Sequence, residues 1–163
     1  MLTKTTRAGI QVLLYLSMEP AGEPASPRSM AGALGCSPTY LAKVAGQLVR
    51  AGILRAHKGA KGGVTLGRPT ARITLLEIVQ ALQGPVLADY CPTLKSPGLA
   101  CRFHQAMFAL HQATIETLSK WTLAELADVS DQTPRRASNT MCILHPVLRA
   151  VAAPARKRGR GEA

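Results

Sequence analysis

Thiol and imidazole side chains lie close together near the middle of the chain. Cys91 precedes Cys101 by ten residues, and His104 follows Cys101 by one helical turn. A thiolate can ligate a metal, form a reversible disulfide, or attack an electrophile when an imidazole assists it. The last use lacks support, because Asp89 is the only carboxylate between residues 86 and 100. We therefore expect these cysteines to be buried, metal-binding or redox-active, and we expect that the protein is not an enzyme.

A long helix is expected to carry Cys101 and His104 at its start. Between residues 101 and 120, side chains recur at alternating spacings of four and three, the pattern of a helix–helix seam. The seam comprises Phe103, Met107, Leu110, Thr114, Thr117 and Trp121. So long an apolar helix at the end of a small domain suits a two-fold dimer. The alternative is that the helix folds back on the core of its own chain.

Residues 26–68 carry the pattern of a helix-turn-helix followed by a β-hairpin. Gly35 suits the left-handed conformation that ends a helix. Ser37 can cap the next helix, with Pro38 at its first position. The apolar residues expected to face the core from this second helix are Leu41, Val44, Ala45, Leu48 and Val49.

The opposite face of the second helix carries side chains that can reach bases or phosphates. A recognition helix presents its N-terminal residues to base edges in the major groove, so Ser37, Thr39, Tyr40 and Lys43 are the first candidates. The full predicted set of DNA-binding residues is Ser26, Arg28, Ser37, Thr39, Tyr40, Lys43, Gln47, Lys58 and Lys61.

A basic, glycine-rich hairpin is predicted directly after the second helix. Residues 53–57 and 64–66 read as its two strands, and Lys58 and Lys61 lie in the turn between them. Such a tip can approach a phosphate backbone or enter a minor groove. The alternative is a solvated hairpin whose lysines only keep it soluble.

The segments on either side of this module are expected to support it. Residues 1–18 predict a helix, and Thr74 with Glu77 predicts the capping box of another helix that Gly84 ends. The sequence thus predicts a winged helix-turn-helix DNA-binding domain (residues 1–84), a sensor loop with a dimerisation helix (85–127) and a disordered basic tail (128–163).

The charge distribution favours a polyanionic partner. The chain has 163 residues and a formal net charge of +11. Counting Lys and Arg against Asp and Glu, residues 1–70 hold nine and two, 71–127 hold four and four, and 128–163 hold seven and three. The excess therefore falls on the predicted DNA-binding domain and on the tail. No segment reads as a membrane span or a secretion leader, so a cytoplasmic location is expected.

These features together resemble the Rrf2-type bacterial transcription regulators over residues 1–127. The stretches that carry the resemblance are LTKTTRAGIQVLLYLS, CSPTYLAKVAGQLVRAGIL, HKGAKGGVTLGRP, ITLLEIVQAL and the Cys-Arg-Phe-His run from Cys101 to His104. The resemblance implies a mainly α fold with a small β-hairpin wing and a long dimerisation helix. It also implies a homodimer that binds a partly palindromic double-stranded DNA operator, and we expect a repressor.

The resemblance further implies an iron–sulfur cluster. Several such regulators hold three cysteine ligands in the loop before the long helix, and here Cys91 matches the first and Cys101 the last. The middle cysteine is missing, and His104 is the third candidate ligand of a [2Fe–2S] cluster, which takes four protein ligands. The alternatives are a cluster-free regulator that uses a Cys91–Cys101 thiol switch or a small effector, and a winged-helix module that binds proteins instead of DNA.

Overall fold

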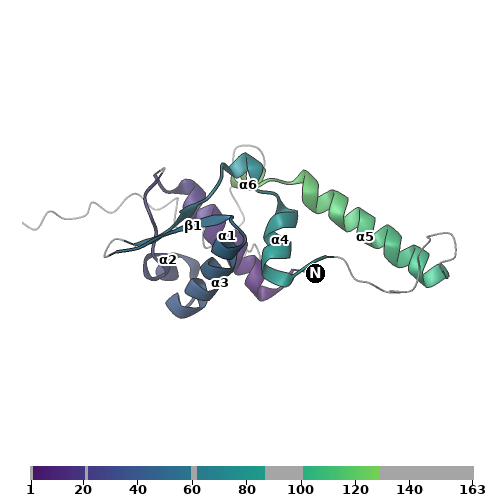
Figure 1. Ribbon diagram of the computed structural model, residues 1–163, viewed down its shortest axis with the longest axis horizontal. Helices are drawn as coiled ribbons and strands as arrows, with labels where there is room; N and C mark the ends of the chain where they lie inside the picture. The colour runs from purple at the N-terminus through teal and green to yellow at the C-terminus, as the bar shows by residue number, and fades with distance from the viewer. Residues whose placement is uncertain (1, 21, 60–61, 87–100, 129–163) are drawn as a thin grey trace, which may run out of the picture.

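The computed structural model describes residues 2–20, 22–59, 62–86 and 101–128. Cys91, Lys61 and the basic tail lie outside these residues. The helices and strands are α1 (Lys4–Met18), α2 (Pro27–Leu34), α3 (Pro38–Arg50), β1 (Leu54–His57), β2 (Gly63–Leu66), the 3₁₀ helix η1 (Thr70–Arg72), α4 (Leu75–Gln83), α5 (Arg102–Lys120) and α6 (Leu123–Ala127). The predicted fold class, mainly α with a small hairpin, is confirmed (Figure 1).

Side-chain caps and a left-handed glycine set the helix-turn-helix locally. The Ser26 hydroxyl accepts a hydrogen bond from the Ser29 amide (3.1 Å) and begins α2. Gly35 ends α2 with a φ of 62°, a left-handed conformation that glycine adopts without a Cβ penalty. Ser37 then caps α3 by accepting from the Tyr40 amide (3.3 Å). The predicted turn at Gly35 and the predicted Ser37 cap are therefore confirmed, whereas the Ser26 cap was not predicted.

One contiguous core joins all of these elements except η1 and α5. Helix α1 lies at its centre, with Val12 and Leu13 fully buried. The faces packed on it come from α2 (Met30, Leu34), α3 (Leu41, Val44, Leu48), the hairpin (Leu54, Val64), α4 (Ile78, Leu82) and α6 (Leu123). Helix α6 thus returns to the winged domain, although the sequence grouped it with the dimerisation helix.

Helix α5 extends away from the core, on the opposite side of the molecule from the hairpin (Figure 1). None of its residues is buried. It therefore does not fold back on the core, which was the alternative to a dimer seam. Within the described residues, no helix has the length and apolar character needed to cross a membrane.

The hairpin, residues 54–66, which we call the wing, is fixed to the start of α2. Its strands pair antiparallel, from Leu54 opposite Leu66 to His57 opposite Gly63. Ala25 forms a further antiparallel bridge with Val64, with N···O distances of 3.0 and 2.9 Å. The backbone of Ala25 passes so close to Gly63 that a Cβ there would lie 2.5 Å from the Ala25 carbonyl oxygen.

We expect Gly63→Ala to lower the free energy of unfolding by about 1–3 kcal/mol, because a rigid backbone, and not a movable side chain, occupies the space. The matched control is Gly32→Ala in α2, where nothing lies within 4 Å of the added Cβ. Removing a helical glycine should there stabilise by up to about 1 kcal/mol. Thermal and urea unfolding measure both. Equal stability of the two variants would contradict the close approach of Gly63 to Ala25.

Candidate nucleic-acid interface

Four of the predicted contact residues lie exposed on the two helices of the turn. Ser37, Thr39 and Lys43 are exposed at the N-terminal part of α3, and Arg28 is exposed on the first turn of α2. Thr39 and Lys43 are four residues apart in a helix, so they lie on one face. Ser26 and Ser37 use their hydroxyl groups as helix caps, which leaves the side chains of Thr39 and Lys43 as the extended polar groups of this face.

Tyr40 and Gln47 are half-buried, in contrast to the fully exposed face that the sequence indicated. The Tyr40 hydroxyl donates to the Thr5 hydroxyl of α1 at 3.4 Å, and its ring packs against the core. The Oε1 atom of Gln47 is buried and has no hydrogen-bond partner among the described residues. Tyr40 therefore links α3 to the start of α1, and its predicted base contact stays a prediction.

The stretch of sequence that contains this face is basic and has no carboxylate of its own. Residues 24–76 contain no Asp or Glu, and their Lys and Arg residues are Arg28, Lys43, Arg50, Arg55, Lys58, Lys61, Arg68 and Arg72. Arg50, Arg55 and Lys58 are exposed. Arg55 was missed in the sequence, although its alternation with buried Leu54 in β1 was a signal that could have found it.

An open groove separates α3 from the wing. Its helix side is lined by small residues, among them Ala42 and Gly46. Its hairpin side is lined by glycines such as Gly59 and Gly62. Lys58 is exposed beside this glycine-rich lining. A polyanion backbone can approach such a surface closely because few side chains stand in its way, and cations at the rim attract it.

A thiol and an imidazole meet at the start of α5. The Cys101 Sγ lies 2.9 Å from Nδ1 of His104, and Cys101 is exposed at the N-cap of the helix. This hydrogen bond, helped by the backbone of residues 103 and 104, lowers the pKa of the Cys101 thiol. The pair has the chemistry of a soft metal ligand and equally that of an oxidisable thiolate.

The described residues hold only part of an iron–sulfur ligand set. A [2Fe–2S] cluster takes four protein ligands, and Cys101 with His104 supplies two. No group of three or more potential metal ligands occurs among the described residues. The third candidate, Cys91, lies outside them.

Comparison with known proteins shows similarity to transcriptional regulators. A family model described as Rrf2, iron-dependent transcriptional regulator, matches residues 2–129. The solved structure of CymR, the global cysteine regulator of B. subtilis, has a TM-score of 0.67 and 26% identity, covering 80% of this chain and 98% of that one. The oxidized form of Staphylococcus aureus CymR follows with a TM-score of 0.64 and 25% identity, covering 81% and 99%.

T. potens IscR is similar in fold, with a TM-score of 0.63 at 24% identity over 83% of this chain and 93% of that one. At this sequence identity, the similarity supports only the shared winged fold.

Proposed function

Because the chain belongs to the Rrf2 family of transcriptional regulators, we propose that it is a homodimeric repressor that presents one winged domain to each half of a DNA operator. The family consists of DNA-binding regulators, so the role is regulatory and not catalytic. The observation that carries the proposal is the run of residues 24–76, which holds eight Lys and Arg residues and no carboxylate. Arg28, Lys43, Arg50, Arg55 and Lys58 of this run are exposed on the two helices and the hairpin. The cytoplasmic location expected from the sequence belongs to the same proposal.

The two parts of this surface take different tasks. Thr39 and Lys43, which are exposed in the N-terminal part of α3, contact base edges in the major groove in this proposal. Arg28, Lys58 and Lys61 supply phosphate contacts, which set affinity but carry little sequence information. The alternative, a winged module that binds proteins, predicts no such dependence on phosphate charge.

We expect Lys58→Ala to weaken binding to operator and random duplexes alike, and to reduce the slope of log K against log salt by about 1. The matched control is Lys120→Ala. Lys120 is equally a surface lysine, but it lies at the end of α5 and pairs with Glu116 at 2.6 Å. Fluorescence anisotropy titrations at several salt concentrations measure both. Binding that is insensitive to salt in the unaltered protein would favour the protein-interaction module.

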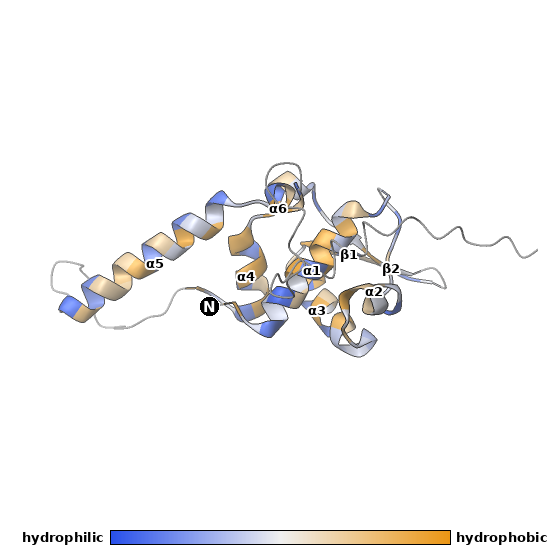
Figure 2. Ribbon diagram, turned by 180° about the vertical axis from the view of Figure 1, so that it is seen from behind, coloured by the Kyte–Doolittle hydropathy of each residue, from blue (hydrophilic) through white to orange (hydrophobic). Residues whose placement is uncertain are grey.

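The dimer part of the proposal rests on the uncovered apolar side of α5. Phe103, Leu110 and Trp121 are 60%, 59% and 49% exposed, and apolar patches alternate with polar ones along the helix (Figure 2). Their spacing of seven and then eleven residues places them on one side of the helix. Phe108, which is 57% exposed, extends this apolar surface to a neighbouring side of the helix. Large apolar groups on a helix that has no buried residue lose contact with water when a second copy covers them.

We expect Leu110→Glu to convert the dimer to monomers, since it places a charge within the apolar seam. Ala109→Glu adds the same charge on the side of α5 that carries Gln105 and Glu116, and it should leave the dimer intact. Sedimentation velocity at micromolar concentration distinguishes the two states. A dimer that survives Leu110→Glu would place the interface elsewhere.

The sensing part of the proposal centres on Cys101. A change in its state, as a cluster ligand with Cys91 and His104 or as a thiol that forms a disulfide with Cys91, would shift α5 and thereby alter the spacing of the two α3 helices on DNA. The contact between Cys101 Sγ and His104 Nδ1, which lowers the pKa of the thiol, supports a reactive thiolate in either case.

We expect Cys101→Ser to abolish the change in operator affinity that oxidation causes, whereas Cys36→Ser, at the half-buried turn cysteine, should leave it unchanged. Anisotropy titrations with and without oxidant measure this. A visible absorption spectrum with iron and sulfide assays on protein purified without oxygen then separates the two chemistries. A response that persists in Cys101→Ser would remove this residue from the sensor.

A further inference from the structure

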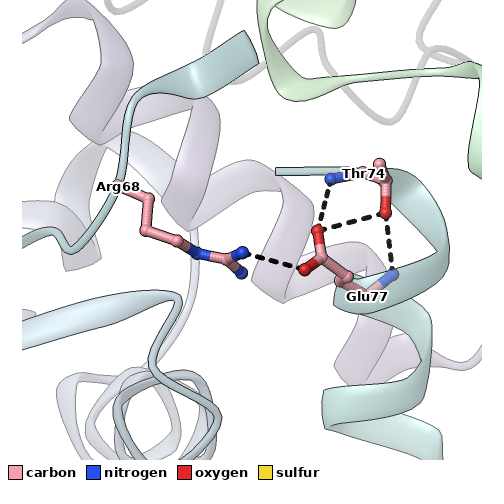
Figure 3. Close-up of polar contacts among 3 residues, drawn as sticks. All are labelled: Arg68, Thr74 and Glu77. Carbon is pink, nitrogen blue, oxygen red and sulfur yellow. Dashed lines mark hydrogen bonds and ion pairs between the residues drawn. The ribbon is translucent and has the colours of Figure 1, made fainter. Parts of the chain in front are cut away.

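The carboxylate of Glu77 joins the start of α4 to the root of the wing, by which we mean residues 67 and 68 directly after β2 (Figure 3). The Oε2 atom of Glu77 accepts from the Thr74 amide (2.9 Å). The Glu77 amide in turn donates to the Thr74 hydroxyl (3.3 Å), which completes a capping box. The Oε1 atom of Glu77 accepts from Nη1 of Arg68 at 2.9 Å. Glu77 therefore bonds both to the cap of α4, at Thr74, and to the root of the wing, at Arg68.

Arg68 lies directly beyond the end of the wing. It follows Leu66, the last residue of β2, by two positions, and Gly67 between them donates its amide to the Ile53 carbonyl (2.9 Å). The ion pair with Glu77 thus adds a side-chain tie where the returning strand leaves the hairpin. The direction in which the wing extends from the body depends on how this root is held.

The end of α5 reaches the same junction. Thr122 forms an antiparallel bridge with Thr74, in which the Leu75 amide donates to the Trp121 carbonyl (2.9 Å) and the Leu123 amide donates to the Ile73 carbonyl (2.8 Å). The residues on both sides of the Thr74 cap are therefore bonded to the chain segment that follows α5. A displacement of the end of α5 acts directly on the cap that Glu77 completes.

We propose that Glu77 is a positioning residue for DNA binding: through Arg68 it holds the wing in its binding orientation and connects that orientation to the α5 junction. The inference rests on the proposed function, because it takes the wing as a DNA contact.

The ion pair adds little to folding, which favours a positioning role. The Arg68 and Glu77 side chains are 35% and 39% exposed, and partly exposed pairs of this kind contribute little to stability. Burial raises the pKa of Glu77, but the Thr74 amide and the Arg68 guanidinium outweigh it and lower that pKa, so the carboxylate is charged at neutral pH. A second capping box, Thr122 with Glu125, has the same local form without an arginine partner among the described ion pairs.

The test uses Glu77→Gln in the full chain. Glutamine retains the capping box at this helix position but removes the charge that holds Arg68. We expect affinity for operator DNA to fall about three- to fivefold, with unchanged dimerisation and unfolding temperature. The salt slope should fall as it does in Lys58→Ala, and Lys58→Ala should have little further effect in this background. Glu125→Gln, in the capping box without an arginine, should bind as the unaltered protein.

Arg68→Gln, which leaves both capping boxes intact, supplies the second arm. If Glu77 positions the wing through Arg68, Arg68→Gln should lose as much affinity for DNA as Glu77→Gln does. The double variant Glu77→Gln with Arg68→Gln should then lose no more than either single variant. If Arg68 instead bound phosphate directly, Glu77→Gln would release it and binding would stay equal or strengthen, which would overturn the inference. Additive losses would also overturn it. Failure of the unaltered protein to bind any duplex would instead count against the proposed function.

Discussion

Burial of α1 is the constraint on which the remaining structure depends. Val12 and Leu13 are completely removed from solvent, and α2, α3, α4, α6 and the wing each cover part of this helix. Gly9 allows Leu82 of α4 to approach closely, because a Cβ at this position would overlap the leucine side chain. The side chain of Gln83 adds a polar tie by accepting from the Thr3 amide (2.7 Å) and the buried Thr6 hydroxyl (2.6 Å). Helix α4 is thereby fixed to α1 along its length.

This packing makes α4 the connection between the two halves of the molecule. Its last residue binds the start of α1, whose Thr5 in turn contacts Tyr40 of α3, and its capping box contacts both the root of the wing and the end of α5. Hydrogen bonds therefore connect the end of α5 through α4 to the wing, and α4 through α1 to α3. Allosteric coupling requires such a shared element with more than one arrangement. The chain belongs to a family of transcriptional regulators.

The charge of the molecule is arranged separately from its packing. Carboxylates are absent from residues 24–76, while α5 and the segments beyond it carry both signs. Since surface charges contribute little to folding but act over a distance comparable to the Debye length, such a segregation serves binding and not stability. The exposed seam of α5 likewise adds nothing to the core of one chain, and only a second surface can bury it.

Local features of this protein were predictable from the sequence, because they depend on residues within one helical turn of each other. The Ser37 cap, the left-handed Gly35 and the Thr74–Glu77 capping box all follow from side-chain hydrogen bonding and backbone conformation at short separation. The basic hairpin spans a longer separation, but the glycine-rich turn between its two short strands made it predictable as well. The tertiary structure alone decided which distant segments the polar side chains and α6 contact. Tyr40 turns to Thr5, Arg68 turns to Glu77, and α6 returns to the core, because each depends on how distant segments pack around α1, a relation that spacing along one chain does not contain.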